Sequence, residues 1–268
     1  MPSNCSGVTP SSSGVLRELY FILRGFLRTS GALFLFFLRL LRYSPTVLFK
    51  RFPLVVHQIH NAGALSLVII MICGFFVGGV LGLQGVSNLA RFNAEDSVGT
   101  LTAFSLLKEL GPVITALLFA GRAGTALSSE IGLMKATDQL AAMEMMATNP
   151  VRRVLVPRFL GGAISMPLLT AVFNVVGLFG AHFVAVGLLQ VDAGAFWQQL
   201  QANVGASDVY EGIIKSVVFG IVASLLAVWE GYNAVPTAEG VGRATTRAVV
   251  KTAIAVLILD FMITAVAI

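Results

Sequence analysis

Four residues interrupt the apolar stretch SLLKELGPVITALLFAGRAG, residues 105–124: Lys108, Glu109, Pro112 and Arg122. The apolar run after Glu109 is roughly 12 residues long, whereas a helix needs about 20 to cross a membrane. A helix that crosses here therefore carries at least one charge at membrane depth, where an ionisable group is costly unless it pairs or faces a polar cavity. These residues are thus functional candidates, and Pro112 predicts a kink. The alternative is that Lys108 extends to the outer interface and simply pairs with Glu109.

A second pair of opposite charges lies at matching depth in the last two apolar segments. Lys215 lies 15 residues before Glu230, or about 22 Å of helix, and Asp260 lies 13 residues after Arg247, or about 20 Å. Because consecutive spans usually lie side by side, we expect an ion pair between Lys215 and Asp260 in the outer half of the membrane. Its role is predicted to be structural, with a functional role as the alternative.

The composition is that of a membrane protein. Hydrophobic residues make up 56% of the 268 positions and charged residues only 12%, against about 25% in an ordinary soluble domain. The cysteines Cys5 and Cys73 provide neither a disulfide framework nor metal-ligand spacing. His57, His60 and His182 have no acidic residue near them in sequence that would complete a metal site or a catalytic pair. We therefore expect neither a metal site nor a catalytic residue.

The amino-terminal quarter divides into a tail and a basic helix. Residues 1–14 are small and polar and are predicted to be disordered. A basic stripe follows, because five arginines fall within roughly 60° of one another around a helix: Arg17, Arg24, Arg28, Arg39 and Arg42. Such a stripe on an apolar helix is typical of a helix in the headgroup plane, so residues 15–60 are interpreted as an interfacial amphipathic helix and its linker. The alternative, a span over GALFLFFLRLL, is too short to cross.

Hydropathy predicts five transmembrane helices in the membrane domain of residues 61–268. Their approximate ranges are 61–85, 99–121, 155–189, 212–229 and 248–268. Fourteen of the eighteen Lys and Arg residues fall on the side of the amino terminus, so the positive-inside rule places that terminus in the cytoplasm and the carboxyl terminus outside. The fold class is an all-α membrane protein. This topology explains the net charge of +5, so no nucleic-acid binding is expected; whether the first span crosses fully or re-enters stays open.

The connection between the second and third spans contains a short amphipathic helix. Residues 137–148 are good helix formers and are followed by Asn149-Pro150, where a helix ends readily. Glu144 lies beside an apolar set at helical spacing, which consists of Leu140, Met143, Met146 and Ala147. Adaptable methionines suit a contact with a groove on another protein. The alternative is a helix on the inner leaflet, which would need more basic residues.

Two long motifs resemble those of a known family. The segment LLKELGPVITALLFAGRAGTALSSEIGLMKATDQLAAMEMMATNPVRRVLVPR and the later segment EGYNAVPTAEGVGRATTRAVV closely resemble the MlaE family, the permease subunit of the Mla phospholipid-transport ABC system of Gram-negative bacteria. The resemblance covers about three-quarters of the chain, from His57 onward. It implies a multi-pass inner-membrane homodimer that helps to maintain the lipid asymmetry of the outer membrane.

The resemblance also implies partners and site residues. The partners are a pair of cytoplasmic ATPase subunits (MlaF-like), a STAS-domain protein (MlaB-like) and a hexameric MCE-domain protein (MlaD-like). Residues 132–150 would form the coupling helix that enters the ATPase, with Glu144 as a contact. An outward-facing lipid pocket at the dimer interface would be lined by Leu81, Leu89, Phe92, Lys108, Glu109 and Leu110.

The expected function is non-catalytic permeation of glycerophospholipids between the inner and outer membranes. No G-x-x-x-x-G-K-[ST] phosphate loop occurs in the chain, so we expect it to hold no cofactor, with ATP bound by the partner ATPase. The alternatives are an intramembrane lipid-modifying enzyme and a passive membrane scaffold. Transport direction and headgroup preference stay open.

Overall fold

The computed structural model describes residues 12–50, 52–92 and 94–267, and this part of the chain is helical apart from short turns and connections. The all-α class predicted from the sequence is therefore confirmed. Most of the predicted tail lies outside the described residues, but residues 12–14 already belong to the first helix. The side chains of Arg17 and Arg24, from the predicted basic stripe, lie outside the described residues as well.

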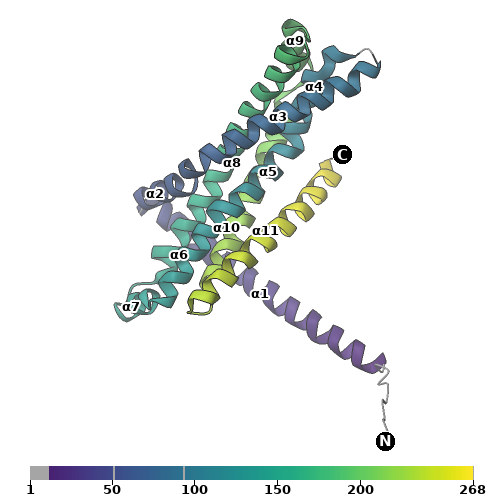
Figure 1. Ribbon diagram of the computed structural model, residues 1–268. Coiled ribbons are helices and arrows are strands. Elements are labelled where there is room, and N and C mark those ends of the chain that lie inside the picture. Colours follow the sequence, from purple (N-terminus) through teal and green to yellow (C-terminus); the bar gives the residue numbers. More distant parts are fainter. Residues whose placement is uncertain (1–11, 51, 93, 268) are drawn as a thin grey trace, which may run out of the picture.

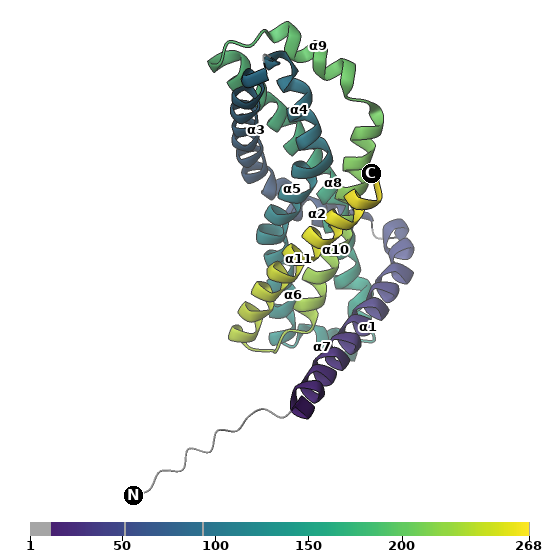
Figure 2. The ribbon, with the colours of Figure 1, turned by 90° about the vertical axis from the view of Figure 1, so that its right-hand side faces the viewer.

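The first helix, α1 (Ser12–Lys50), lies along one side of the other helices, and its amino-terminal part extends beyond them (Figure 2). Phe36, Leu40 and Val47 are buried against the bundle, whereas Leu35 and Leu38 are exposed. The segment Arg28–Leu48 is long and apolar enough to cross a membrane. The described residues thus contain six candidate spans where the sequence predicted five, because one continuous helix extends the short apolar run to 21 residues. That this helix is interfacial stays a prediction.

The remaining elements form a bundle with two ends (Figure 1). α7 (Gln139–Met145) lies at one end and α9 (Ala193–Asn203) at the other. The long segments between these ends are α2 (Phe52–Ala62) with α3 (Leu67–Leu89); α4 (Val98–Phe104), α5 (Gly111–Phe119) and α6 (Thr125–Ala136); α8 (Val156–His182); α10 (Ala206–Tyr232); and α11 (Ala238–Ala267). We call the two ends the α7 end and the α9 end.

Glycines bring α3 and α8 into close contact along the bundle. A Cβ atom at Gly78 would overlap the backbone of Gly177, and one at Gly74 would lie 3.0 Å from the carbonyl oxygen of Phe173. Small residues of this kind let helix backbones approach closely in lipid, where packing rather than hydrophobic burial drives association. The glycine-rich first span therefore packs through its glycines.

The segment around Pro112 contains a widened helical turn rather than a regular α-helix. Residues Ser105–Leu110 form a π-helix, η4, and the N–H of Gly111 donates to the carbonyl of Leu106, five residues earlier. Pro112 has no N–H to donate to the carbonyl of Lys108, four residues before it, and its ring would crowd that oxygen in an α-helix. The wide turn resolves the crowding and leaves the Lys108 carbonyl available to another donor.

Candidate functional site

A network of charged side chains joins η4, α10 and α11 in the half of the molecule nearer the α9 end. The Lys108 ammonium lies 2.8 Å from Asp208 Oδ1 and 3.3 Å from Glu211 Oε2. The Lys215 ammonium lies 3.8 Å from Glu211 Oε1 and 3.7 Å from Asp260 Oδ1. Two cations are therefore held by three carboxylates, and we call these five residues the charge network.

Lys215 occupies the interior of the charge network. Its side chain is fully buried, and its ammonium donates to the carbonyl oxygen of Lys108 and to Thr264 Oγ1, both at 2.8 Å. The Lys108 carbonyl is the one to which Pro112, which has no N–H, cannot donate. A buried carbonyl must find a partner, and Lys215 supplies it from a neighbouring helix. The proline and the buried lysine thus form one structural unit.

Close backbone approach makes this unit possible. A Cβ atom at Gly212 would overlap the carbonyl oxygen of Leu107, so α10 lies against η4 at the position of this glycine. Asp208, Glu211 and Lys215 lie on the same face of α10, since residues three or four apart are neighbours on a helix. All three therefore point toward η4 or α11.

An apolar groove of about 500 Å³ borders the charge network. Glu211 is its acidic member, and its apolar walls come from α10 and α11: Ile214, Leu259, Met262, Ile263 and Val266. Lys108 retains a side-chain exposure of 33% although it is paired. The site therefore combines an apolar surface with accessible charges of both signs, which suits an amphiphilic molecule.

The predicted site residues are distributed over two regions of the molecule. Lys108 pairs with α10 rather than with its neighbour Glu109, which is exposed. Leu81 packs against the central core, while Leu89 packs against a separate cluster near α9. Phe92 is 79% exposed. Leu110 is partly buried in η4 next to Lys108.

Sequence reasoning missed Asp208 and Glu211. The signal that was available is their spacing, because they precede Lys215 by seven and four residues and so share its helical face. The sequence also offered a pairing of Lys108 with Glu109. The structure shows the Lys108 ammonium paired with α10 instead.

At the α7 end, left-handed residues delimit a short helix. Asp138 and Ala147 have φ values of 56° and 54°, so α7 spans seven residues rather than the predicted twelve. Leu140 is buried, and Met143 packs against the core. The predicted apolar set is therefore divided: Leu140 and Met143 face the core, whereas Met146 and Ala147 are exposed.

The outward-facing methionines are Met145 and Met146. Their side chains are 90% and 70% exposed and adjacent in sequence, and an exposed apolar patch marks a surface that another protein or a membrane can cover. Glu144 is also exposed beside them. The surface of Glu144, Met145 and Met146, which we call the α7 surface, is the part of the predicted coupling region that is free to contact another protein.

Other charged and polar candidates are held by structural contacts. Arg122, in the π-helix η5 (Ala120–Gly124), donates to the carbonyl of Asn61 at 3.0 Å and to Ser66 Oγ at 3.1 Å. These bonds tie η5 to the connection between α2 and α3. The His182 ring packs edge-on against Phe196 with centroids 5.3 Å apart. Within the described residues, no three His, Cys, Asp or Glu side chains are grouped so that they could hold a metal ion.

Comparison with known proteins gives a consistent result. The family model of Permease MlaE matches residues 55–266. The intermembrane phospholipid transport system permease protein MlaE of Haemophilus influenzae is 53% identical over 81% of this chain and 84% of its own length. A probable ABC transporter permease of Rickettsia typhi is 36% identical over 79% of this chain and 82% of its own length. The chloroplastic protein TRIGALACTOSYLDIACYLGLYCEROL 1 of Arabidopsis thaliana is 27% identical over 78% of this chain and 59% of its own length.

Proposed function

The chain belongs to the MlaE family of phospholipid-transport permeases, and we propose that it moves glycerophospholipids between the inner and outer membranes of a Gram-negative bacterium. In this proposal it acts as a non-catalytic homodimer in the inner membrane and helps to maintain the lipid asymmetry of the outer membrane. It binds each lipid in an outward-facing pocket at the dimer interface. The observation that carries the proposal is the apolar groove directly beside the charge network.

The groove and the charge network correspond to the two parts of a phospholipid. Acyl chains need an apolar surface, which the walls from α10 and α11 offer. The headgroup phosphate needs a cation, and the side chain of Lys108, which ends in an ammonium, is 33% exposed. The buried ammonium of Lys215 holds η4 and α11 in place from behind.

The exposed face of α11 supports a pocket shared between two copies of the chain. This helix is the least buried of the candidate spans, and its apolar side chains Leu257, Ile258 and Phe261 are each more than half exposed. The groove residues Met262 and Val266 continue the same face. A second copy packed here would enclose the groove.

Transport needs energy from a partner. We assign the α7 surface as the contact with a cytoplasmic ABC ATPase, because its two exposed methionines suit an adaptable docking groove. The STAS-domain and hexameric MCE-domain partners follow from family membership, and ATP would be bound by the ATPase. The orientation with the amino terminus inside follows from the positive-inside rule.

The test is lipid transfer by the purified transport complex in proteoliposomes, with the Lys108→Gln variant compared with wild type. We expect transfer to fall about tenfold or more, because a charged hydrogen bond to the headgroup is lost. The matched control is Arg91→Gln, since Arg91 is an exposed cation toward the α9 end that makes no ion pair within the described residues. Equal transfer by both variants would contradict the headgroup assignment.

The same assay separates the other two function classes. A lipid-modifying enzyme would change the mass of the recovered lipids, and a passive scaffold would give transfer that is independent of ATP. Intact lipids and ATP-dependent transfer are the expected results.

A further inference from the structure

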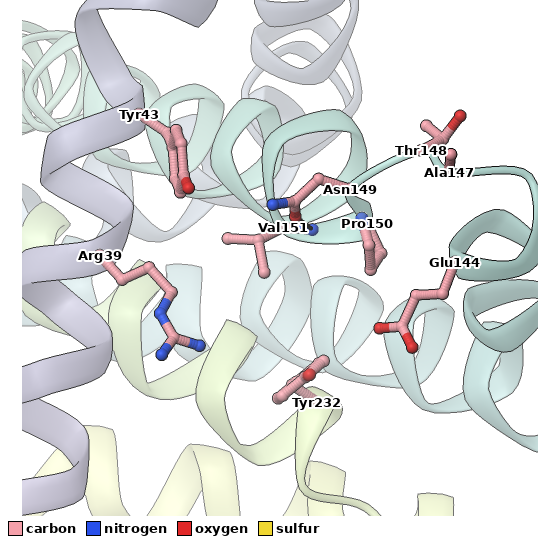
Figure 3. Close-up of a pocket in the computed structure, with 9 residues that line it drawn as sticks. All are labelled: Arg39, Tyr43, Glu144, Ala147, Thr148, Asn149, Pro150, Val151 and Tyr232. Carbon is pink, nitrogen blue, oxygen red and sulfur yellow. Dashed lines mark hydrogen bonds between the residues drawn. The ribbon is translucent and has the colours of Figure 1, made fainter.

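A polar cavity of about 590 Å³ lies at the α7 end, far along the bundle from the charge network. α1 contributes Arg39 and Tyr43, α7 contributes Glu144, the connection that follows contributes Asn149, and α10 contributes Tyr232 (Figure 3). Three elements that are distant in sequence therefore meet around one opening.

The floor of the cavity is held in place by packing. The ring of Tyr232 stacks on that of Phe36 from α1, with centroids 5.9 Å apart, and Phe36 also packs edge-on against Trp229 at 5.2 Å. The Lys135 ammonium donates to the Tyr232 carbonyl at 2.8 Å and lies over its ring. The relative position of α1 and α10 is thus fixed at this point.

The cavity presents unused hydrogen-bond donors. Within the described part of the chain, Arg39 makes no ion pair or side-chain hydrogen bond, and Figure 3 shows its guanidinium extending from α1 into the opening. The side-chain oxygen of Asn149 already accepts from the N–H of Val151 at 3.0 Å, so its amide N–H groups remain as donors. A guanidinium fork matches the oxygens of a phosphate, to which it can donate twice.

The surroundings of Arg39 indicate where the phosphate comes from. Leu35, one helical turn before Arg39 on the same side of α1, is 67% exposed. An apolar side chain next to an arginine on a membrane helix places the arginine at the boundary between acyl chains and headgroups. The anions at that boundary are phospholipid phosphates.

We propose that this cavity binds the phosphate of an inner-leaflet phospholipid headgroup through Arg39. The bound headgroup connects α1 to the segment that carries the α7 surface, because the same cavity is lined from both sides. This site is separate from the groove at α11, with which it shares no lining residue.

The experiment measures binding of the water-soluble lipid dihexanoyl-phosphatidylethanolamine to the full-length chain in detergent by native mass spectrometry. We expect Arg39→Gln to weaken binding about tenfold or more, as loss of a charged hydrogen-bond pair predicts. Arg42→Gln is the matched control, because Arg42 is an exposed arginine on the same helix but does not line the cavity. It should bind as wild type does. Thermal unfolding of each variant verifies that the fold is intact.

Four results would overturn the proposal. Equal loss in both variants would show a general attraction of basic residues for headgroups. Equal binding of dihexanoylglycerol, which lacks phosphate, would show a purely apolar contact. Full competition by millimolar inorganic phosphate would identify a site for a free anion rather than for a lipid. Finally, unchanged lipid binding by Arg39→Gln together with lost ATPase assembly would assign Arg39 to a protein contact.

Discussion

Replacement of Lys215 by methionine tests the charge network most directly. Methionine keeps much of the side-chain volume but removes the ammonium that donates to the Lys108 carbonyl and to Thr264. A carbonyl that loses its donor lowers the free energy of unfolding by about 1–3 kcal/mol. Breaking a buried ion pair by removing one partner lowers it by about 3–5 kcal/mol. Asp260 and Glu211 are 20% and 26% exposed, so water screens part of their charge. We therefore expect Lys215→Met to lower the free energy of unfolding by about 3 kcal/mol, the lower end of the range for a buried ion pair.

The assay is the free energy of unfolding in mixed micelles, obtained by SDS titration and followed by far-UV circular dichroism. A double-mutant cycle with Asp260→Leu isolates the interaction, since the double variant removes both charges. We expect it to be at least about 1 kcal/mol more stable than the sum of the single variants predicts. Arg243→Met is the control, because its side chain is 73% exposed in a surface ion pair, and it should change stability by less than about 0.5 kcal/mol. Additivity of the two network variants within about 0.5 kcal/mol would refute the coupling.

Two further predictions concern packing and the partner surface. Gly212→Ala should destabilise the protein by about 1–3 kcal/mol in the same titration, because the added methyl group would overlap the Leu107 carbonyl. The control is Gly121→Ala, which should be neutral or stabilising because a Cβ atom at Gly121 meets no atom within 4 Å. Met145→Asp should abolish ATP-dependent transport in the complex while leaving the unfolding curve unchanged, whereas Leu140→Asp should lower stability because Leu140 is buried. Wild-type transport by Met145→Asp would contradict the assignment of the α7 surface.

Much of the fold is predictable from the sequence because it depends on local periodicity. The apolar composition and the 1.5 Å rise of a helix were enough to place the five main membrane segments, and the same arithmetic put Lys215 and Asp260 at equal depth. In the structure their charged atoms are 3.7 Å apart. The candidate span in α1 was not predicted, because GALFLFFLRLL is too short to cross by itself and the continuous helix adds apolar turns on either side of it.

The candidate site depends on contacts between helices that are distant in sequence, and neighbouring residues in the sequence do not predict such contacts. Glu109 adjoins Lys108 in sequence, yet the Lys108 ammonium pairs with Asp208, one hundred residues away, because Gly212 allows α10 to approach η4. The left-handed backbone at Asp138 and Ala147 likewise decides which side chains of the predicted coupling region face outward.

The sequence by itself determined a helical membrane protein, the pairing of Lys215 with Asp260 and, through two long motifs, its family. Only the tertiary structure decided which charges are partners, which methionines face outward and how Pro112 and Lys215 form one unit. The physical reason is one of range. Periodicity and hydropathy act within a few turns of one helix, whereas an ion pair or a hydrogen bond forms only when packing brings two helices within about 3–4 Å at those atoms.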